Sequence, residues 1–108
     1  MIVVDLDQNG ITVDGHSGYA EQGKDIVCAA VSVLAQTLAI SLEELTDDRI
    51  ILTQREGHMR IDYKNLSERG QLLVDSFFIG ICGVAESYPG YLQIAGRALS
   101  GRRDDHEV

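Results

Sequence analysis

The chain opens with alternating apolar and polar residues, which is typical of a strand with one buried face. The alternation runs over residues 2–7 and resumes over residues 11–14, with the two-residue period of a β-strand. Asn9-Gly10 lies between the two runs, and this dipeptide is a strong signal for a hairpin turn because both residues tolerate positive φ. The pattern predicts a β-hairpin over residues 1–15.

A glycine-containing loop and then a helix are expected next. Gly15–Lys24 holds three glycines and shows no periodicity, which predicts a loop of about ten residues, a length that often has a function. Asp25 is a good N-cap, because its carboxylate can accept hydrogen bonds from the first turn. We expect a helix over Asp25–Leu45, since apolar residues then recur at helical spacing: Val27, Val31, Leu34, Leu38 and Leu45.

The second half of the chain repeats this order of elements. Residues 48–63 alternate around Glu56-Gly57, which predicts another hairpin. A second helix is expected over Leu66–Ser87, with Asn65 and Glu68 spaced as a capping box and Pro89-Gly90 ending it. Tyr91–Ala95 is a short candidate strand.

The element order ββαββαβ predicts an α/β fold of the α+β type. We expect one two-layer domain over residues 1–96, with two helices packed on a mostly antiparallel or mixed sheet. Residues 97–108 form a polar C-terminal tail that we expect to be disordered.

The second helix carries more apolar surface than one contact needs. One stripe consists of Leu73, Phe77, Ile81 and Val84, and a neighbouring stripe of Val74, Phe78, Cys82 and Ala85. We expect one stripe to pack on the sheet and the other to join a second subunit in a homodimer. The alternative is a fully buried helix in a monomer.

Composition narrows the class of protein. A chain of 108 residues with 44% hydrophobic residues is long enough for one core and is not intrinsically disordered. Its apolar runs are interrupted, and its start turns acidic at once, so we expect neither a membrane segment nor a secretory signal. Two cysteines do not suggest a disulfide scaffold, which makes the cytoplasm the expected compartment.

Charge bears on the expected partners. Nine Lys and Arg against 17 Asp and Glu give a formal net charge of −8. Phosphate contacts need clustered cations, so we expect no direct nucleic-acid binding. The acidic surface suits a basic partner or substrate, although solubility alone also explains it.

Cys28 and His16 are the residues best placed to carry chemistry. Cys28 falls in the first turn of the first helix, where unpaired N–H groups and the helix dipole favour a thiolate. His16 follows the first hairpin, and the loop between the two could fold back to bring imidazole and thiol together as base and nucleophile. Helix-start N–H groups could also stabilise an oxyanion. The alternatives are a small core cysteine and an ordinary loop histidine.

Other kinds of site have weaker support. His16, Cys28, His58 and Cys82 could supply zinc ligands, but no pair has the short spacing that marks such sites, and we expect no metal. The loop glycines match neither nucleotide-binding pattern, and we expect no cofactor. Cys82 lies mid-helix, where packing is its expected role.

The segment GHSGYAEQGKDIVCAAVS, residues 15–32, resembles the signature of Prp, a family of bacterial ribosomal-processing cysteine proteases. The resemblance lies in Gly-His, a short glycine-containing loop, Asp-Ile-Val-Cys-Ala and a serine four residues after the cysteine. Ser17 departs from it, since alanine is common there, but both residues are small. The likeness extends in length and element order over about the first 95 residues.

The resemblance implies a cytoplasmic homodimeric endopeptidase with Cys28 as nucleophile and His16 as general base. It implies that the substrate is the precursor of large-subunit ribosomal protein twenty-seven, whose N-terminal extension is removed after an aromatic or apolar pair. Gly15, Asp25 and Ser32 match supporting positions. We expect a substrate-binding loop over Ser17–Lys24 that closes over the peptide, with Ser17, Gly18, Tyr19, Gly23 and Lys24 as its named residues.

The role of the supporting residues and the class of protein both have alternatives. Asp25 either caps the helix or holds His16, and Ser32 could bond the thiol or a backbone group. No third catalytic acid is evident, so a dyad is expected. The rival function is a non-enzymatic acidic adaptor that binds a ribosomal or other basic protein.

Overall fold

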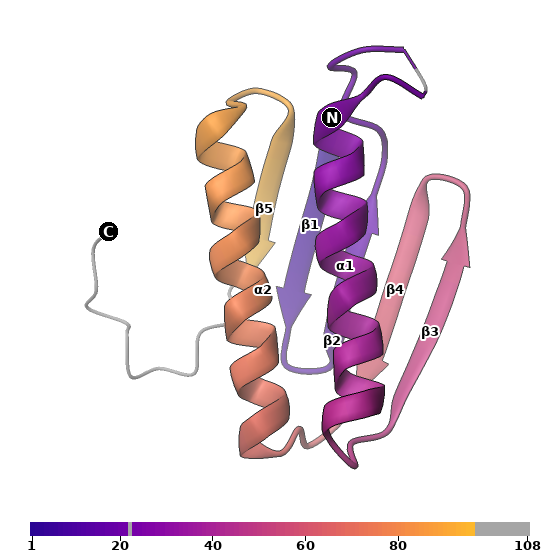
Figure 1. The fold of residues 1–108 in the computed structure, drawn as a ribbon, viewed down its shortest axis with the longest axis vertical. Coiled ribbons are helices and arrows are strands. Elements are labelled where there is room, and N and C mark those ends of the chain that lie inside the picture. The colour runs from indigo at the N-terminus through magenta and orange to yellow at the C-terminus, as the bar shows by residue number, and fades with distance from the viewer. Residues whose placement is uncertain (22, 97–108) are drawn as a thin grey trace.

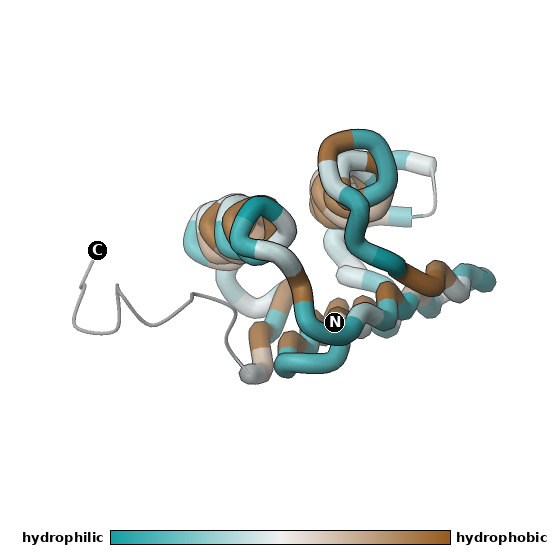
Figure 2. The backbone as a smooth tube through the Cα atoms, turned by 90° about the horizontal axis from the view of Figure 1, so that it is seen from below, coloured by the Kyte–Doolittle hydropathy of each residue, from teal (hydrophilic) through white to brown (hydrophobic). Residues whose placement is uncertain are grey.

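The computed structural model describes residues 1–21 and 23–96, and the predicted tail over residues 97–108 lies outside them. Its elements are β1 (Ile2–Asp7), β2 (Gly10–Asp14), α1 (Ile26–Leu45), β3 (Ile50–Arg55), β4 (His58–Tyr63), α2 (Glu68–Ser87) and β5 (Leu92–Gly96). The predicted order ββαββαβ is confirmed. Both helices lie side by side on the same side of the sheet (Figures 1 and 2), which makes a two-layer α+β domain.

The five strands form one mixed sheet in the order β3-β4-β2-β1-β5. Its pairs are antiparallel except for the parallel pair of β1 with β5. The crossover from β4 through α2 to β5 carries the chain across the sheet and leaves the first hairpin in the centre (Figure 1). The ends of β2 and of the β3–β4 hairpin therefore lie next to each other, which matters for the site described below.

The core lies between the sheet and the two helices. Alternate residues of β1 and β4 point toward the helices and are buried, whereas the residues between them are exposed or half-buried, as period two requires. The helices supply the other half of the core through Val27, Val31, Ala35, Leu38, Ala39, Leu42, Val74, Phe77 and Ile81. One apolar cluster thus holds the two layers together.

The first hairpin is confirmed, but its turn differs from the prediction by one position. Asp7 pairs with Gly10, so the turn residues are Gln8 and Asn9, and neither Asn9 nor Gly10 has positive φ. Gly10 is needed for a different reason. A Cβ there would lie 2.5 Å from the carbonyl oxygen of Ile61 and from the Arg60 guanidinium. Glycine is needed at position 10 because it lets β2 and β4 pack closely.

The start of α2 corrects a second detail. Ser67 is the N-cap and its hydroxyl accepts the Gly70 N–H at 3.0 Å. Asp48 fixes Ser67 in turn by accepting from its N–H at 3.0 Å. Asn65 instead adopts a left-handed conformation with φ 54, so the predicted capping box of Asn65 with Glu68 is wrong. Asn65 and Ser67 are both suitable N-cap residues, and the contact with Asp48 selects Ser67.

The apolar stripes predicted on α2 are divided differently by the structure. Val74 and Phe77, which belong to different predicted stripes, are both buried in the core, and Phe78 is half-buried against it. The outward face instead carries Leu72 and Ile79, which are 55% and 60% exposed. A rotation of the helix by a fraction of a turn accounts for the difference, because neighbouring stripes are offset by one residue.

Both helices contain a long, predominantly apolar window. Each has 20 residues, and their mean hydropathies reach 1.9 and 1.2. By length and composition alone either could therefore cross a membrane, contrary to what the interrupted runs predict. Each helix lies lengthwise on the sheet (Figure 1) and buries one face in the core, which accounts for much of this apolar character.

Candidate active site

Cys28 lies in the first turn of α1, as predicted, and is half-buried. The N-cap prediction is also confirmed, because Asp25 Oδ1 accepts the N–H groups of Val27 and Cys28 at 3.0 Å each. The backbone N–H of Ser17 approaches the Cys28 sulfur at 3.3 Å. A backbone donor beside the sulfur and a place at the start of a 20-residue helix are surroundings typical of reactive cysteines.

Ser17 and Asp25 form a small frame behind the thiol. The Ser17 side chain is buried, and its hydroxyl donates to Asp25 Oδ2. Desolvation alone would raise the pKa of Asp25, but the hydrogen bonds from Ser17 and from the Cys28 N–H outweigh it and lower the pKa to about 2. Both oxygens of Asp25 are engaged away from His16, so Asp25 caps the helix and fixes the loop.

Three backbone N–H groups at the start of α1 already have hydrogen-bond partners, which bears on the predicted oxyanion site. The N–H groups of Val27 and Cys28 donate to the Asp25 side chain, and that of Ala29 donates to the Asp25 carbonyl at 3.1 Å. These three donors are engaged in the helix cap in this structure, and the expected oxyanion role of the helix start stays a prediction. The Ser17 N–H is the backbone donor that lies beside the sulfur.

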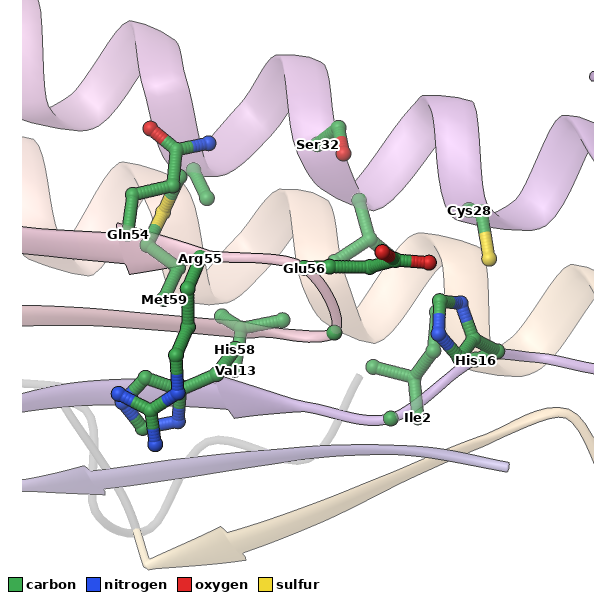
Figure 3. Close-up of a pocket in the computed structure, with 14 residues that line it drawn as sticks. Ile2, Val13, His16, Cys28, Ser32, Gln54, Arg55, Glu56, His58 and Met59 are labelled. Atoms are coloured by element: carbon green, nitrogen blue, oxygen red, sulfur yellow. The ribbon is translucent and has the colours of Figure 1, made fainter.

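His16 follows β2 directly and lies across a cavity from Cys28. The Gly15 N–H donates to the Gly57 carbonyl at 2.8 Å, which pins this chain end to the β3–β4 turn. The His16 Nε2 atom lies 3.2 Å from the position that a Cβ on Gly57 would take, so a side chain there would press on the ring. In Figure 3 the imidazole and the thiol point toward one another. The structure thus brings the two predicted residues together.

Two adjoining cavities open around this pair. The first, of about 260 Å³, runs along α1 toward β3 and β4, and the second, of about 480 Å³, lies between the helix start and the loop before it. His16, Cys28, Ser32 and Glu56 line both. Their sizes fall near or within the range of ligand pockets, and together they leave room for side chains on either side of the thiol.

The predicted loop residues take three different places. Gly18 and Gly23 line the larger cavity, whereas Lys24 pairs with Glu21 at 3.2 Å in solvent. Tyr19 packs edge-on against two tyrosines that flank the end of α2, with ring centroids 5.5 Å from Tyr88 and 5.2 Å from Tyr91. Ser17 belongs to the frame behind the thiol. The loop is thus anchored at Ser17 and Tyr19.

Two further observations concern Ser32 and Glu56, a residue that the sequence analysis overlooked. Ser32 is exposed and points into the cavity (Figure 3), and it makes no hydrogen bond to the thiol among residues 1–21 and 23–96. The sequence pattern indicates Glu56 only as a turn residue, yet its carboxylate reaches the same space as Cys28 and His16 (Figure 3). No local signal could have found it, because the strand order brings that turn to the helix start.

The second cysteine and the second histidine have other surroundings. Burial raises the pKa of Cys82, and the charge of Glu86 adds to the effect. His58 Nδ1 lies 2.5 Å from the Asp14 carboxylate on the open face of the sheet. Among the residues that the structure describes, no group of three or more His, Cys, Asp or Glu side chains could hold a metal ion.

Two named proteins are similar to this chain over most of its length. A protein of Mycoplasma genitalium named ribosomal processing cysteine protease Prp is 29% identical over 96 residues, which are 87% of this chain and 94% of that protein. A Staphylococcus aureus protein of the same name is 28% identical over 97 residues, covering 82% of this chain and 92% of its own length.

Solved structures share the fold. SMU.848 from Streptococcus mutans is 33% identical with a TM-score of 0.74, covering 90% of this chain and 96% of its own. The S. aureus protease Prp in complex with a covalently linked product peptide has a TM-score of 0.83 at 24% identity, over 90% and 100% of the two chains. The family described as cysteine protease Prp matches residues 1–93. The chain therefore belongs to the Prp family of cysteine proteases.

Proposed function

We propose that Cys28 and His16 form the catalytic dyad of an endopeptidase. The observation that carries this proposal is that thiol and imidazole face each other across one cavity (Figure 3), while the Ser17 N–H approaches the sulfur. A positioned base and a stabilised thiolate are what nucleophilic catalysis by cysteine requires. Asp25 supports the dyad through the helix cap rather than by contact with His16.

The reaction proceeds in two stages. His16 takes the thiol proton, and the Cys28 sulfur attacks the carbonyl carbon of the scissile bond, which forms a tetrahedral intermediate with negative oxygen. The intermediate collapses with cleavage of the C–N bond, and His16 gives its proton to the leaving amine. Water, deprotonated by His16, then attacks the thioester, releases the acid and restores the thiol. The Ser17 N–H is the nearby backbone donor for the oxyanion.

The substrate that fits this site best is the precursor of large-subunit ribosomal protein twenty-seven. The signature in residues 15–32 supports this choice, as do curated relatives named for ribosomal processing. A net charge of −8 suits a basic ribosomal protein. The enzyme removes a short N-terminal extension after an aromatic or apolar pair, and it works in the cytoplasm.

Paired substitutions test the dyad. Cys28→Ser keeps the shape but removes the strong nucleophile, and His16→Ala removes the base. Each should lower turnover of a precursor peptide by at least ~100-fold. The double variant should lose about as much as either single variant, because the two residues act as a unit. Cleavage is followed by mass spectrometry, with Cys82→Ser as the matched control. Undiminished cleavage by Cys28→Ser contradicts the mechanism.

The same variants separate the protease from an acidic adaptor. Calorimetry should show that Cys28→Ser still binds the uncut peptide, since recognition comes from the cavities and the loop. If the unmodified chain binds precursor peptides and cleaves none of them, the adaptor replaces the protease as the function of this surface.

A homodimer through the outer face of the helices is the expected assembly. That face carries Val33, Ile40, Leu72 and Ile79, each more than half exposed, and an apolar stripe on both helices is the surface that a second copy would cover. Ile79→Glu should place a charge there and give a monomer in light scattering. Gln93→Glu, at an exposed position of β5 outside the helices, makes the same change of net charge and is the control. An unchanged mass for Ile79→Glu removes this face from the interface.

A further inference from the structure

Glu56 is the one charged side chain of the β3–β4 turn that faces the thiol. The turn is held in place by Gly57, whose φ of 73 suits glycine and whose carbonyl accepts the Gly15 N–H. In Figure 3 the Glu56 carboxylate points into the space between Ser32, Cys28 and His16. The backbone of the turn that carries Glu56 is therefore held beside His16 and Cys28.

The Glu56 carboxylate is free to bind something else. It has no hydrogen-bond or ion-pair partner among residues 1–21 and 23–96. Asp25 lines the same cavity, but both of its oxygens are engaged by the helix cap and by Ser17. Glu56 is thus the acid of this cavity with unused acceptor capacity.

The larger cavity around Glu56 is shaped for a long side chain. Gly18, Ala20, Gly23 and Ala29 line it, and these small residues leave its volume of about 480 Å³ open. No Lys or Arg is among its described lining residues. Arg55, which lines the smaller cavity, directs its guanidinium away from the thiol (Figure 3). The negative charge at Glu56 is therefore not cancelled from within the cavity.

We propose that Glu56 is a specificity-determining residue that selects a lysine or arginine side chain of the substrate peptide beside the scissile bond. An acidic group in a cleft attracts a cationic side chain and rejects an anionic one, because like charges oppose each other at short range. The small lining residues let the aliphatic part of lysine or arginine cross the cavity while its charged end reaches Glu56. The inference deepens the proposed function and rests on the Cys28–His16 dyad.

A charge-reversal experiment tests this selection. The probe is a peptide that spans the extension junction of the precursor, made with Lys, Gln or Glu placed one position at a time on either side of the scissile bond. At one position the unmodified enzyme should prefer Lys over Glu by about two- to fivefold in kcat/KM, as expected for an exposed charge pair. Glu56→Gln should reduce this ratio toward one, and Glu56→Lys should invert it.

Controls separate selection from general electrostatics and from an effect on His16. Glu44→Lys makes the same change of net charge at the far end of α1 and should leave the preference intact. Added salt should lower the preference of the unmodified enzyme. The proposal is overturned if Glu56→Lys keeps the Lys-to-Glu ratio at every position. It is also overturned if Glu56→Gln slows all peptides alike and moves the pH profile of kcat, since that shows a positioning role through His16.

The experiment also distinguishes failure of the dyad from failure of the selection. If the unmodified chain cleaves no peptide, the same peptides are bound to Cys28→Ser with and without Glu56→Lys, and fluorescence anisotropy measures the affinities. A preference for Lys that inverts with Glu56→Lys supports the cation site even though the protease mechanism has failed. Equal affinities for Lys and Glu peptides refute the cation site.

Discussion

The two cysteines have the same half-buried status but different chemistry, because they occupy different places on two helices of equal length. Cys28 is in the first turn of α1, with a backbone N–H 3.3 Å from its sulfur and an imidazole across a cavity. Cys82 is in the interior of α2, where burial and Glu86 raise its pKa. The two sulfur atoms therefore differ in the donors and charges around them and not in their exposure.

The difference extends to how the two helices begin. Asp25 starts α1 with a carboxylate whose second oxygen holds the adjoining loop through Ser17. Ser67 starts α2 with a hydroxyl that is itself held by Asp48. The first cap joins α1 to a loop that lines the candidate active site. The second joins α2 to Asp48, in the segment between α1 and β3. Of the two caps, only Asp25 makes a further hydrogen bond to a residue beside the Cys28 thiol.

Among the effects that separate the two cysteines and the two helix starts, the largest is expected in thiol alkylation. Cys28 should react with iodoacetamide at least ~10-fold faster than Cys82 in the folded protein, because burial and the charge of Glu86 raise the pKa of Cys82, whereas a backbone N–H and an imidazole face the Cys28 sulfur. Labelling followed by peptide mass spectrometry measures both rates in one sample. His16→Ala should slow Cys28 and leave Cys82 unchanged. Equal or reversed rates would show that the surroundings of Cys28 do not activate it.

A smaller effect is expected from the cap of α1. Asp25→Asn keeps an acceptor but removes the charge, and it should lower peptide cleavage by roughly three- to tenfold through misplacement of Ser17 and Cys28. Asn at this N-cap remains a good capping residue, so the helix should persist by circular dichroism. Full activity in Asp25→Asn would show that its charge is not needed to place the thiol.

The pH dependence of stability tests the same carboxylate. Folding lowers the pKa of Asp25 from 3.8 to about 2, so the unfolded state binds the proton more tightly and the stabilisation is fully present above pH 3.8. It should be lost as the pH falls from 3.8 to 2. Thermal unfolding across this range should show the loss in the unmodified chain and not in Asp25→Asn. Ser17→Ala removes one of the hydrogen bonds that lower the pKa of Asp25. The loss of stability should then be complete at a higher pH.

The smallest effect concerns the anchor of the loop at Tyr19. Tyr19→Ala removes the edge-on contacts with Tyr88 and Tyr91 and should raise KM about two- to fivefold, with kcat little changed. Tyr19→Phe keeps the rings in contact and is the matched control. If both variants behave like the unmodified enzyme, the tyrosine contacts do not help to place the loop for substrate.

Much of the fold could be predicted from the sequence because its signals are local. Period-two alternation identified the hairpins, and Asp25 was correctly assigned as the cap of α1. The errors arose where two local signals competed. Asn9-Gly10 favours a turn by its conformational freedom, but the close approach of Ile61 to Gly10 fixes the register. Asn65 and Ser67 could each start α2, and the contact with Asp48 decides between them.

The sequence by itself determined the element order, the placement of Cys28 in a helix start and the pairing of that thiol with His16 as candidates, since each depends on residues near in the chain. Only the tertiary structure decided what surrounds them. The strand order places the β3–β4 turn beside His16 and brings Glu56 into the cavity, and the folded loop turns the Ser17 N–H toward sulfur. These contacts join segments distant in sequence, and side-chain packing across layers sets them rather than any local pattern.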